Sequence, residues 1–503
     1  MITLEDFVVL KQLSVKNITI EPKKVKATYE VQTFKGDVSN FDLIYSYDLA
    51  YFDKKSSSNA NLASMMLAQV ALNYGLFFQT IVFDGLYDKI DKRFLIDMLE
   101  NTSREVLTNK LLIKNEFLKP EFCNLKPEKR SKYTQAKIEF VNTKFTNLKV
   151  VKESVQTDKS KYAILSSGGK DSLLTYGIVK ELGEPFPIFI NESGRHWFTA
   201  VNAYRHYKEV ESNTSKPWTN CDRAFNWMLK QLPFIKENYA SIRSDIYPVR
   251  LWTVAVFLFG TLPIVRSKNI ANILIGDEYD TTVVSHNNGI THYNGLYDQS
   301  KYFDNALTRY FTSKGYNIFQ FSLLRSLSEL LIMKTLIKRY PDLQQHQVSC
   351  HAAHEVNGRM YPCGKCEKCR RIIGMLKALD ENPERCGYSN KQIENGLRAL
   401  ENQSVKQIGP DAAHLYFLMV EKGVVEKNAF TKKLAKAHPS ITKLRFDSER
   451  SNLEDLPEYV RKPLFNILKE YADGAVRRNI HIWENIEMND EFIYQSPYKF
   501  SVK

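Results

Sequence analysis

"YAILSSGGKDSLLTYGIVKELG", Tyr162–Gly183, is the stretch that decides the fold. Its apolar start is typical of a buried strand, and after a Ser-Ser-Gly-Gly turn an amphipathic pattern predicts a helix over Asp171–Leu182. Gly168 and Gly169 can adopt backbone angles that a side chain forbids, so successive N–H groups can point toward one bound group. The helix start adds unsatisfied donors and a partial positive charge. The stretch therefore predicts a phosphate-binding turn.

The motif in this turn is neither of two familiar phosphate-binding patterns. A Walker A motif fails because Ile164 stands at its first glycine and Asp171 follows the lysine, and the dinucleotide GxGxxG pattern is absent. Ser-Gly-Gly-Lys-Asp-Ser, Ser167–Ser172, instead resembles the pyrophosphate loop of the N-type ATP pyrophosphatases, which transfer AMP to an acceptor. The alternative is a Gly-rich turn that only caps a helix. The resemblance implies that Asp171 helps to hold Mg²⁺, that Lys170, Asp171 and Ser172 are catalytic, and that ATP is bound by Ser166, Ser167, Gly168, Gly169, Lys170, Asp171 and Ser172.

The residues after the turn alternate between strand and helix patterns. Pro185–Asn191 and Ile270–Glu278 are short apolar runs typical of buried strands, and Thr199–Lys208 has a helical pattern. Apolar strands that alternate with helices predict a parallel sheet with helices on both faces. We therefore expect an α/β fold, a doubly wound parallel sheet, over residues 156–385.

Different patterns flank this unit. Short alternating apolar runs in the first fifty residues predict strands, Leu62–Phe78 predicts a buried helix, and Gln79–Gly85 predicts a strand. We expect an α+β N-terminal domain over residues 1–155, with a boundary near Val155. Beyond residue 385 the chain has the patterns of helices joined by polar loops, which predicts a mainly helical C-terminal region over 386–503. The sequence assigns neither region a role.

The composition is that of a basic globular protein. Lys and Arg number 70 against 57 Asp and Glu, a net charge of +13, which favours an anionic partner such as nucleotide or nucleic acid or reflects a solvated basic surface. The longest apolar stretch, Leu251–Val265, is too short for a membrane span and contains Gly260 and Pro263. The first residues lack the pattern of a signal peptide, so we expect a cytoplasmic protein.

Four cysteines lie close together in "CHAAHEVNGRMYPCGKCEKC". Two Cys-x-x-Cys steps that share a central cysteine make a compact corner of three thiolates, and a fourth cysteine upstream can complete a tetrahedron around structural Zn²⁺. His351 or His354 can replace the upstream ligand, and an iron–sulfur cluster is the competing cofactor. The predicted metal ligands are Cys350, Cys363, Cys366 and Cys369.

The order of these features resembles the 7-cyano-7-deazaguanine synthase (QueC) family, in which a cysteine cluster follows a pyrophosphate loop. The similarity extends roughly over residues 161–378 and includes the stretches "SGRHW", "YPVRL", "IGDEYD" and "LYDQSKYFDNAL". It implies an adenine-nucleotide alpha-hydrolase-like (HUP) doubly wound sheet with a zinc-binding knuckle. The implied substrate-binding residues are Arg195, His196, Arg250, Asp277 and Asp280, with Asp298 and Asp304 as further candidates.

The resemblance also implies a reaction. Members of the family use ATP to adenylate 7-carboxy-7-deazaguanine, ammonia displaces AMP, and the amide is activated again and dehydrated to the nitrile, a step of queuosine biosynthesis. We therefore expect an ATP-dependent, C–N bond-forming ligase that needs ATP, Mg²⁺ and Zn²⁺. Some enlarged relatives in antiviral defence process deazaguanine-like groups on other molecules, so a protein or tRNA acceptor is a further expectation, as is a homodimer.

Three departures from the family pattern keep other functions open. Lys170 stands where the family usually has an apolar residue, Leu251 replaces an asparagine, and a glutamine before Arg195 is missing. The loop with lysine is more typical of tRNA-thiolating and amidating members of the superfamily. The alternatives are therefore a tRNA-modifying sulfur transferase and a non-catalytic, zinc-stabilised binding module.

Overall fold

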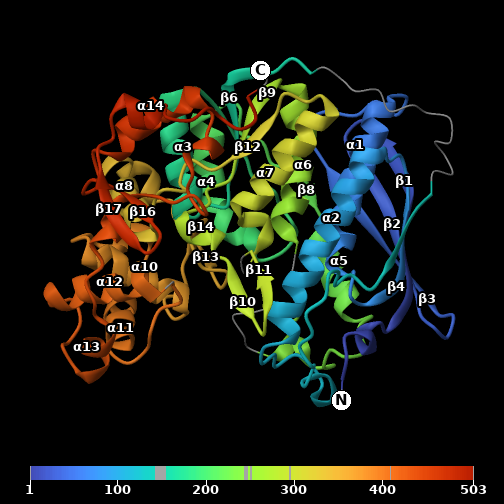
Figure 1. Cartoon of the computed structure of the whole chain (residues 1–503), viewed down its shortest axis with the longest axis horizontal. Helices are drawn as coiled ribbons and strands as arrows, with labels where there is room; N and C mark the ends of the chain where they lie inside the picture. The colour runs from blue at the N-terminus through green and yellow to red at the C-terminus, as the bar shows by residue number, and fades with distance from the viewer. Residues whose placement is uncertain are drawn as a thin grey trace.

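The computed structural model describes residues 2–141, 155–242, 247–249, 252–293, 296–407 and 409–501 (Figure 1). The protein is a mixed α/β structure with a six-stranded sheet near the N-terminus and a four-stranded sheet in the middle of the chain. A helical region with a small sheet follows. No helix in these residues has both the length and the apolar character needed to cross a bilayer.

The strand before the glycine turn is β6 (Asp158–Leu165), which lies inside a fully parallel sheet. The sheet order is β12 (Phe319–Phe321), β9 (Ile270–Leu274), β6 and β7 (Glu184–Ile188). Every residue of β9 is buried, as expected where helices cover both faces. The chain runs from β6 to β7 on one side and later to β9 and β12 on the other, so the direction reverses between β6 and β9. Ligands of open parallel sheets bind at the carboxyl ends of strands that flank such a reversal.

A short segment beyond β7 joins the parallel sheet to the N-terminal sheet. Residues 215–218 pair in parallel with Ile188, the last residue of β7, and with Asn191 just beyond it. The same segment ends in β8 (Trp218–Thr219), which pairs antiparallel with β3 (Val38–Ser46). The two sheets are therefore continuous through this segment.

The N-terminal sheet has the strand order β5-β4-β1-β2-β3-β8. In β2 (Lys24–Gln32) buried residues alternate with half-exposed ones, the period of a sheet with one face in the core. β1 (Leu10–Glu21) pairs antiparallel with β2 and parallel with β4 (Phe78–Asp84), and β5 (Lys137–Val141) extends the parallel edge. The strands that the sequence predicts in the first fifty residues are confirmed.

The helices divide between two hydrophobic clusters. α3 (Lys170–Leu182) and α4 (His196–Val210) pack in one cluster with the C-terminal region. The other cluster contains residues of α1 (Ser57–Ala68), α2 (Lys89–Val106), α6 (Thr253–Ser267) and α7 (Lys301–Lys314). α3 and α4 thus lie on one side of the parallel sheet, and α6 and α7 on the other (Figure 1).

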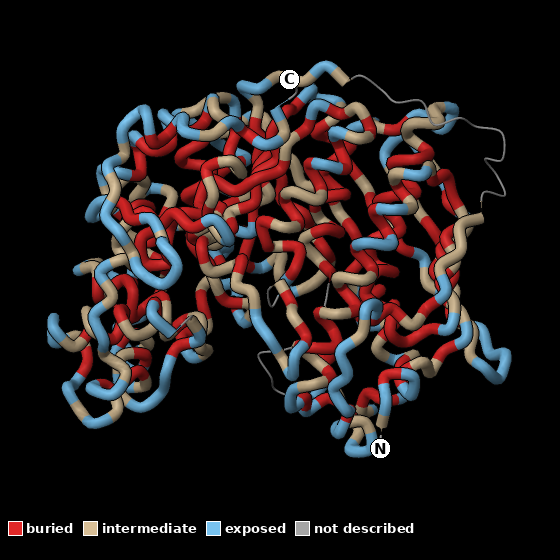
Figure 2. The backbone as a smooth tube through the Cα atoms, viewed as in Figure 1, coloured by how far each residue is buried: buried red, intermediate tan, exposed pale blue. Residues whose placement is uncertain are grey.

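Buried residues run from the N-terminal sheet into the parallel sheet (Figure 2). Tyr45 in β3 and Tyr47 just after it donate hydrogen bonds to the carbonyls of Val256 and Gly260 in α6, at 3.3 and 2.7 Å. The N-terminal and central regions therefore share a core. The predicted domain boundary near Val155 directly follows residues 142–154, which lie outside the described residues.

The C-terminal region contains a three-stranded sheet that the sequence did not predict, as well as helices. The order is β15 (Leu444–Phe446), β16 (Ala475–Asn479) and β17 (Ile482–Ile486). Such short strands offer few alternating positions, and β15 pairs in parallel with a strand far along the chain, which no local pattern encodes. The helices are α11 (Asn390–Leu400), α12 (Gly409–Glu421), α13 (Ala429–Leu434), α14 (Glu458–Leu468) and α15 (Asp490–Ile493).

The remaining elements are short or connect these units. They are α5 (Cys221–Leu229), β10 (Ser285–Asn287), β11 (Ile290–His292), α8 (Glu329–Arg339), α9 (Pro341–Gln344), β13 (His354–Val356), β14 (Arg359–Tyr361) and α10 (Glu367–Ala378).

Candidate phosphate-binding loop and metal centre

Gly168 gives the turn after β6 its shape. Its φ is +75°, in the left-handed region that favours glycine. A Cβ at this position would stand 2.2 Å from the carbonyl oxygen of Thr199, in the first turn of α4. The Thr199 hydroxyl also donates a hydrogen bond to the Ser167 carbonyl, at 3.0 Å. The turn is therefore fixed against α4, and only glycine fits at position 168.

The start of α3 follows the turn directly. Gly169 precedes the helix, and no side chain caps its first N–H groups. By contrast, Ser300 and Ser328 cap the starts of α7 and α8. An uncapped helix start after a glycine turn offers backbone donors and a partial positive charge to an anion.

The predicted ATP-binding side chains differ in their surroundings. Ser167 is exposed, and 31% of the Asp171 side chain is exposed. Ser166 and Ser172 are buried and donate hydrogen bonds to backbone carbonyls, those of Ile164 and Gly169. Ser167 and Asp171 therefore reach solvent, whereas Ser166 and Ser172 support the turn.

Lys170 is buried at the start of α3, with 5% of its surface exposed. Its ammonium lies 2.7 Å from Asp171, 3.3 Å from Glu278 and 3.3 Å from Glu329. Burial alone would lower the pKa of Lys170, but the three carboxylates outweigh burial and raise the pKa above its usual value. Lys170 therefore keeps its charge, and its ammonium holds the Asp171 carboxylate in place.

Glu329 connects this lysine to the cysteine region. It lies 3.5 Å from Arg371 of α10 and accepts a hydrogen bond from the side-chain amide of Gln407 at 2.6 Å. Burial opposes ionisation of Glu329, but Lys170 and Arg371 lower its pKa to about 2. The loop therefore shares a charged network with the helix that begins in the cysteine cluster.

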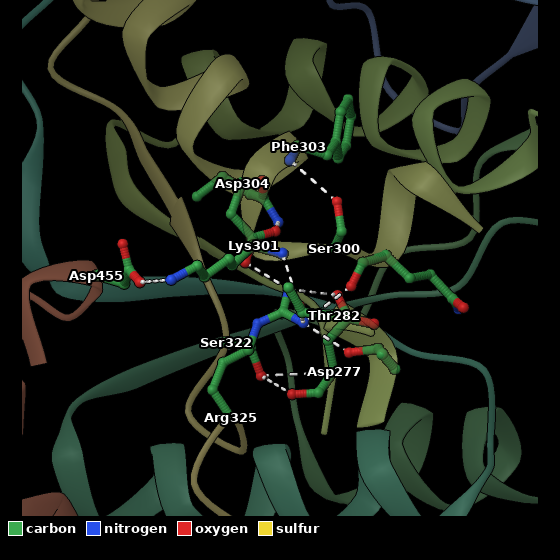
Figure 3. A network of polar contacts seen from close by, with 12 residues as sticks. Asp277, Thr282, Ser300, Lys301, Phe303, Asp304, Ser322, Arg325 and Asp455 are labelled. Carbon is green, nitrogen blue, oxygen red and sulfur yellow. Dashed lines mark hydrogen bonds and ion pairs between the residues drawn. The ribbon is translucent and has the colours of Figure 1, made fainter. Parts of the chain in front are cut away.

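Asp277, a predicted substrate-binding residue, lies in the buried network that Figure 3 shows. Its carboxylate is 3.4 Å from Arg325, which pairs with Asp304 at 2.6 Å. The Ser322 hydroxyl donates to the Asp277 carbonyl at 2.7 Å. Burial raises the pKa of Asp277 well above its usual value, although Arg325 opposes the rise. Asp277 and Asp304 thus fix the segment after β9 from within the core.

Asp298 is also buried, and it accepts a hydrogen bond from the backbone N–H of Ala255 at 3.1 Å. Ala255 lies in the first turn of α6, where N–H groups lack partners within the helix. Asp298 therefore stabilises the start of α6.

Asp280, another predicted substrate-binding residue, contacts the C-terminal region. Arg445 lies 3.8 Å from Asp280 and 3.4 Å from Asp411, and its guanidinium stacks over the Tyr279 ring at 4.0 Å. Tyr279 donates a hydrogen bond to Asp447 at 2.9 Å. Burial, together with the nearby Asp411, raises the pKa of Asp280 to about 7. The C-terminal region thus supplies charged residues to the segment after β9.

The predicted substrate-binding residues at α4 lie beside the cysteine region. Arg195, just before the helix, is exposed, and His196 is its first residue, three residues earlier than the sequence predicts. The His196 ring centroid is 4.5 Å from that of His351. Burial, and then the charge of Lys368, lowers the pKa of His196 to about 4. Arg250 lies outside the described residues.

The four predicted metal ligands, Cys350, Cys363, Cys366 and Cys369, come together, with all Sγ atoms within 4.8 Å of one another. The Sγ of Cys366 is 3.6 Å from that of Cys350 and 3.5 Å from that of Cys369. The backbone N–H groups of Lys365 and Cys366 both lie 3.4 Å from the Cys363 sulfur, which stabilises a thiolate. This group could hold a tetrahedral metal ion such as zinc.

The chain segments next to the cysteines are hydrogen-bonded to the loop and to α4. The backbone N–H of Val348 donates to the Gly168 carbonyl at 3.2 Å. Asn202 of α4 exchanges two hydrogen bonds with the Met360 backbone, both at 2.9 Å. The glycine turn, the start of α4 and the cysteine group therefore form one connected unit.

Several charged residues around the loop and the segment after β9 are not among the predicted site residues. Glu278 and Arg371 had a sequence signal, since Glu278 lies within a stretch already singled out and Arg371 directly follows the cysteine cluster, but the others are scattered along the chain and only the fold brings them together. They are Glu278, Arg325, Glu329, Arg371 and Arg445.

The glycine turn lies where the strand order of the parallel sheet reverses, between β6 and β9. The group of four thiols lies next to it. No protein-family model matches the chain, and no curated protein matches it.

Proposed function

We propose that the protein is an ATP-dependent ligase that adenylates a carboxylate, releases pyrophosphate and then forms a C–N bond. The proposed substrate is 7-carboxy-7-deazaguanine or a similar carboxylate. The acceptor is ammonia or an amine on a protein or nucleic acid, and a cytoplasmic role in antiviral defence belongs to the same proposal.

One observation carries this proposal. The Ser-Gly-Gly-Lys-Asp-Ser turn lies at the carboxyl end of β6, beside the reversal of strand order, and runs into the uncapped start of α3. Backbone N–H groups there, with the exposed Ser167 hydroxyl, suit the oxygens of a leaving pyrophosphate. The strand, turn and helix thus combine the donors and the position that nucleotide sites in parallel sheets use.

Asp171 is the residue we assign to Mg²⁺. Its carboxylate is partly exposed beside the turn, and its contact with Lys170 fixes its orientation. Carboxylate oxygens are the protein ligands that Mg²⁺ prefers, so the residue fits the ion. When bound, Mg²⁺ would neutralise charge on the polyphosphate.

The reaction follows from the chemistry of the carboxyl group, which is a poor electrophile at neutral pH. A carboxylate oxygen attacks the α-phosphorus of ATP, the bond to the bridging oxygen breaks, and pyrophosphate leaves. The nitrogen of the acceptor then attacks the carbonyl carbon, loses a proton, and displaces AMP. The protein contributes by holding the reactants in line and by stabilising the leaving pyrophosphate.

The role we assign to the cysteine group is structural. Its four sulfurs could hold zinc with no open position, and the segment before Cys350 donates a hydrogen bond to the loop at Gly168. A bound zinc would therefore keep the segment before Cys350 in contact with the phosphate loop. A sulfur transferase would instead need an iron–sulfur cluster or a persulfide, so metal analysis and the absorption spectrum separate the two functions.

The test uses the purified full-length protein with ATP, Mg²⁺, ammonium and 7-carboxy-7-deazaguanine. We expect carboxylate-dependent formation of AMP and pyrophosphate, with an amide product, or the nitrile after a second ATP activates the amide and water is lost, detected by mass spectrometry. Asp171→Asn should lower the rate at least about 100-fold, as expected when a charged contact to the transition state is lost. The matched control is Asp158→Asn in β6, where 45% of the side chain is exposed, and this variant should keep the wild-type rate. Full activity of Asp171→Asn, or no AMP from the wild type, would refute the proposal.

A further inference from the structure

The ammonium of Lys170 has one carboxylate for each of its N–H donors. It lies 2.7 Å from Oδ1 of Asp171, 3.3 Å from Oε2 of Glu278 and 3.3 Å from Oε1 of Glu329. An ammonium has three N–H groups and cannot accept a hydrogen bond. The three contacts therefore account for its donors, and the ammonium could bind a phosphate oxygen only if it left one of the carboxylates.

The ammonium also lies on the inner side of the Asp171 carboxylate. The side chains of Lys170 and Glu329 are almost fully buried, whereas nearly a third of the Asp171 side chain is exposed. The Asp171 carboxylate is therefore more accessible to a ligand from solvent than the ammonium behind it is.

Glu329 is itself anchored, through both its side chain and its backbone. Its Oε1 faces Lys170, while its Oε2 accepts a hydrogen bond from the side-chain amide of Gln407 at 2.6 Å. Glu329 is the first residue of α8, and the preceding Ser328 caps this helix and donates a hydrogen bond to the Ile441 carbonyl at 2.6 Å. Glu329 therefore gives the Lys170 ammonium a fixed partner within the fold.

Moving the ammonium out to a phosphate would leave buried charge uncompensated. Glu329 would lose the nearer of its two cationic partners, since Arg371 lies 3.5 Å away. Glu278 would lose its contact with the ammonium as well. Removing one partner of a buried ion pair is strongly unfavourable, because the other charge stays buried without its counter-charge. The buried carboxylates therefore favour an ammonium that stays behind Asp171.

We propose that Lys170 and Glu329 are positioning residues for the Mg²⁺-binding carboxylate of Asp171, and that the ammonium does not contact the phosphates. This inference rests on the proposed function, and it leaves the phosphates to the backbone N–H groups of the turn and to Ser167. Glu329 fixes the ammonium, and the ammonium fixes the direction in which the Asp171 carboxylate points. Groups behind a metal ligand commonly orient the ligand in this way.

The competing role for Lys170 is that of a phosphate ligand, which the sequence predicts. The two roles differ in their dependence on Mg²⁺. A phosphate ligand contributes to ATP binding with or without the ion, whereas a residue that positions Asp171 contributes only when the ion is bound.

The experiment measures ATP binding to the full-length protein by calorimetry, first in EDTA and then over a series of free Mg²⁺ concentrations. Lys170→Met/Glu329→Gln removes one charge of each sign, so the net charge near the phosphates is unchanged. We expect the variant to bind ATP in EDTA as the wild type does. The free Mg²⁺ concentration that gives half of the Mg²⁺-dependent tightening should rise about 10- to 100-fold, the usual effect of losing a group behind a metal ligand. A lost phosphate ligand would instead weaken ATP binding in EDTA about 10- to 100-fold.

The matched control is a second buried lysine, Lys314, which contacts Asp88 and Asp91 at the start of α2. Lys314→Met/Asp88→Asn also removes one charge of each sign from a buried pair, outside the charged set around Lys170. It should leave ATP binding unchanged both in EDTA and across the Mg²⁺ series, even if it lowers the melting temperature.

The outcomes separate this inference from the proposed function. If Lys170→Met/Glu329→Gln binds ATP more weakly in EDTA, or keeps the Mg²⁺ dependence of the wild type, the inference is wrong while the proposed function stands. If the wild type binds no ATP, both are wrong. Should this variant fail to fold, Glu329→Asp carries the same test, because it keeps both charges and draws the carboxylate back from Lys170 by one methylene group. It should give the same two results.

Discussion

Gly276 lies directly against Asp171: a Cβ at position 276 would stand 2.8 Å from the carbonyl carbon of Asp171 and 2.9 Å from its Cβ. Gly276 follows β9, and Asp171 is the second residue of α3, the helix after β6, so the contact joins the carboxyl ends of the two strands between which the sheet order reverses. The position of the Asp171 carboxylate therefore depends on the absence of a side chain at position 276.

We expect Gly276→Ala to weaken ATP binding about tenfold or more, because the first turn of α3 must move away from the loop. Overpacking at a tight backbone contact should also lower the free energy of unfolding by about 1–3 kcal/mol. Calorimetric titration with ATP and chemical denaturation measure the two effects.

The matched control for this substitution is Gly409→Ala. No heavy atom lies within 4 Å of a Cβ built at Gly409, so the same added methyl group meets open space. ATP affinity equal to that of the wild type in Gly276→Ala would show that the contact does not position the loop.

The cysteine group gives a prediction for metal removal. Cys366→Ser should reduce the bound metal and lower the melting temperature, because Cys366 contacts the sulfurs of two other predicted ligands. The substitution should also weaken ATP binding, since the segment before Cys350 is bonded to Gly168. Elemental analysis, thermal denaturation and ATP titration measure the three effects.

Cys123→Ser is the control for the cysteine chemistry, because Cys123 is exposed and lies outside the group. It should leave metal content and melting temperature unchanged. Unaltered metal content in Cys366→Ser, or unaltered ATP affinity after chelation, would contradict the coupling between the metal centre and the loop.

The loop and the metal ligands could be predicted because their chemistry is local. A strand, two glycines and a helix start stand within one stretch, and three of the four cysteines follow one another at fixed steps. Helical and strand periods likewise predicted α3 and the N-terminal strands. Predicting these features does not require knowledge of tertiary contacts.

The surroundings of Lys170 could not be predicted, because they depend on tertiary contacts. The sequence placed its ammonium among the ATP-binding groups, and the structure shows two of its three carboxylate partners, Glu278 and Glu329, coming from elsewhere in the chain. The same holds for Arg445, which reaches Asp280 from a sheet whose strands are too short to show a pattern.

Asp280 gives a prediction for the pH dependence of stability. Its pKa is raised from 3.8 to about 7 in the folded protein by burial and by Asp411, against the attraction of Arg445 and Arg450. The folded state therefore holds this proton more tightly than the unfolded state does. The stabilisation from this proton is fully present below about pH 4 and is lost as the pH rises to about 7. Above about pH 7 stability no longer changes through this group.

Asp280→Asn removes this titration while keeping a polar side chain of similar size. We expect the variant to be more stable than the wild type by about 1–3 kcal/mol at pH 8, because each pKa unit corresponds to about 1.4 kcal/mol and the pair with Arg445 is lost in part. At pH 4 the two proteins should be nearly equal. Urea denaturation across this pH range measures the difference in the free energy of unfolding between the two proteins. Taking this difference cancels the titration of other groups such as Glu278, because they are present in both proteins. A difference that stays constant with pH would show that Asp280 is ionised in the folded protein throughout, held by Arg445.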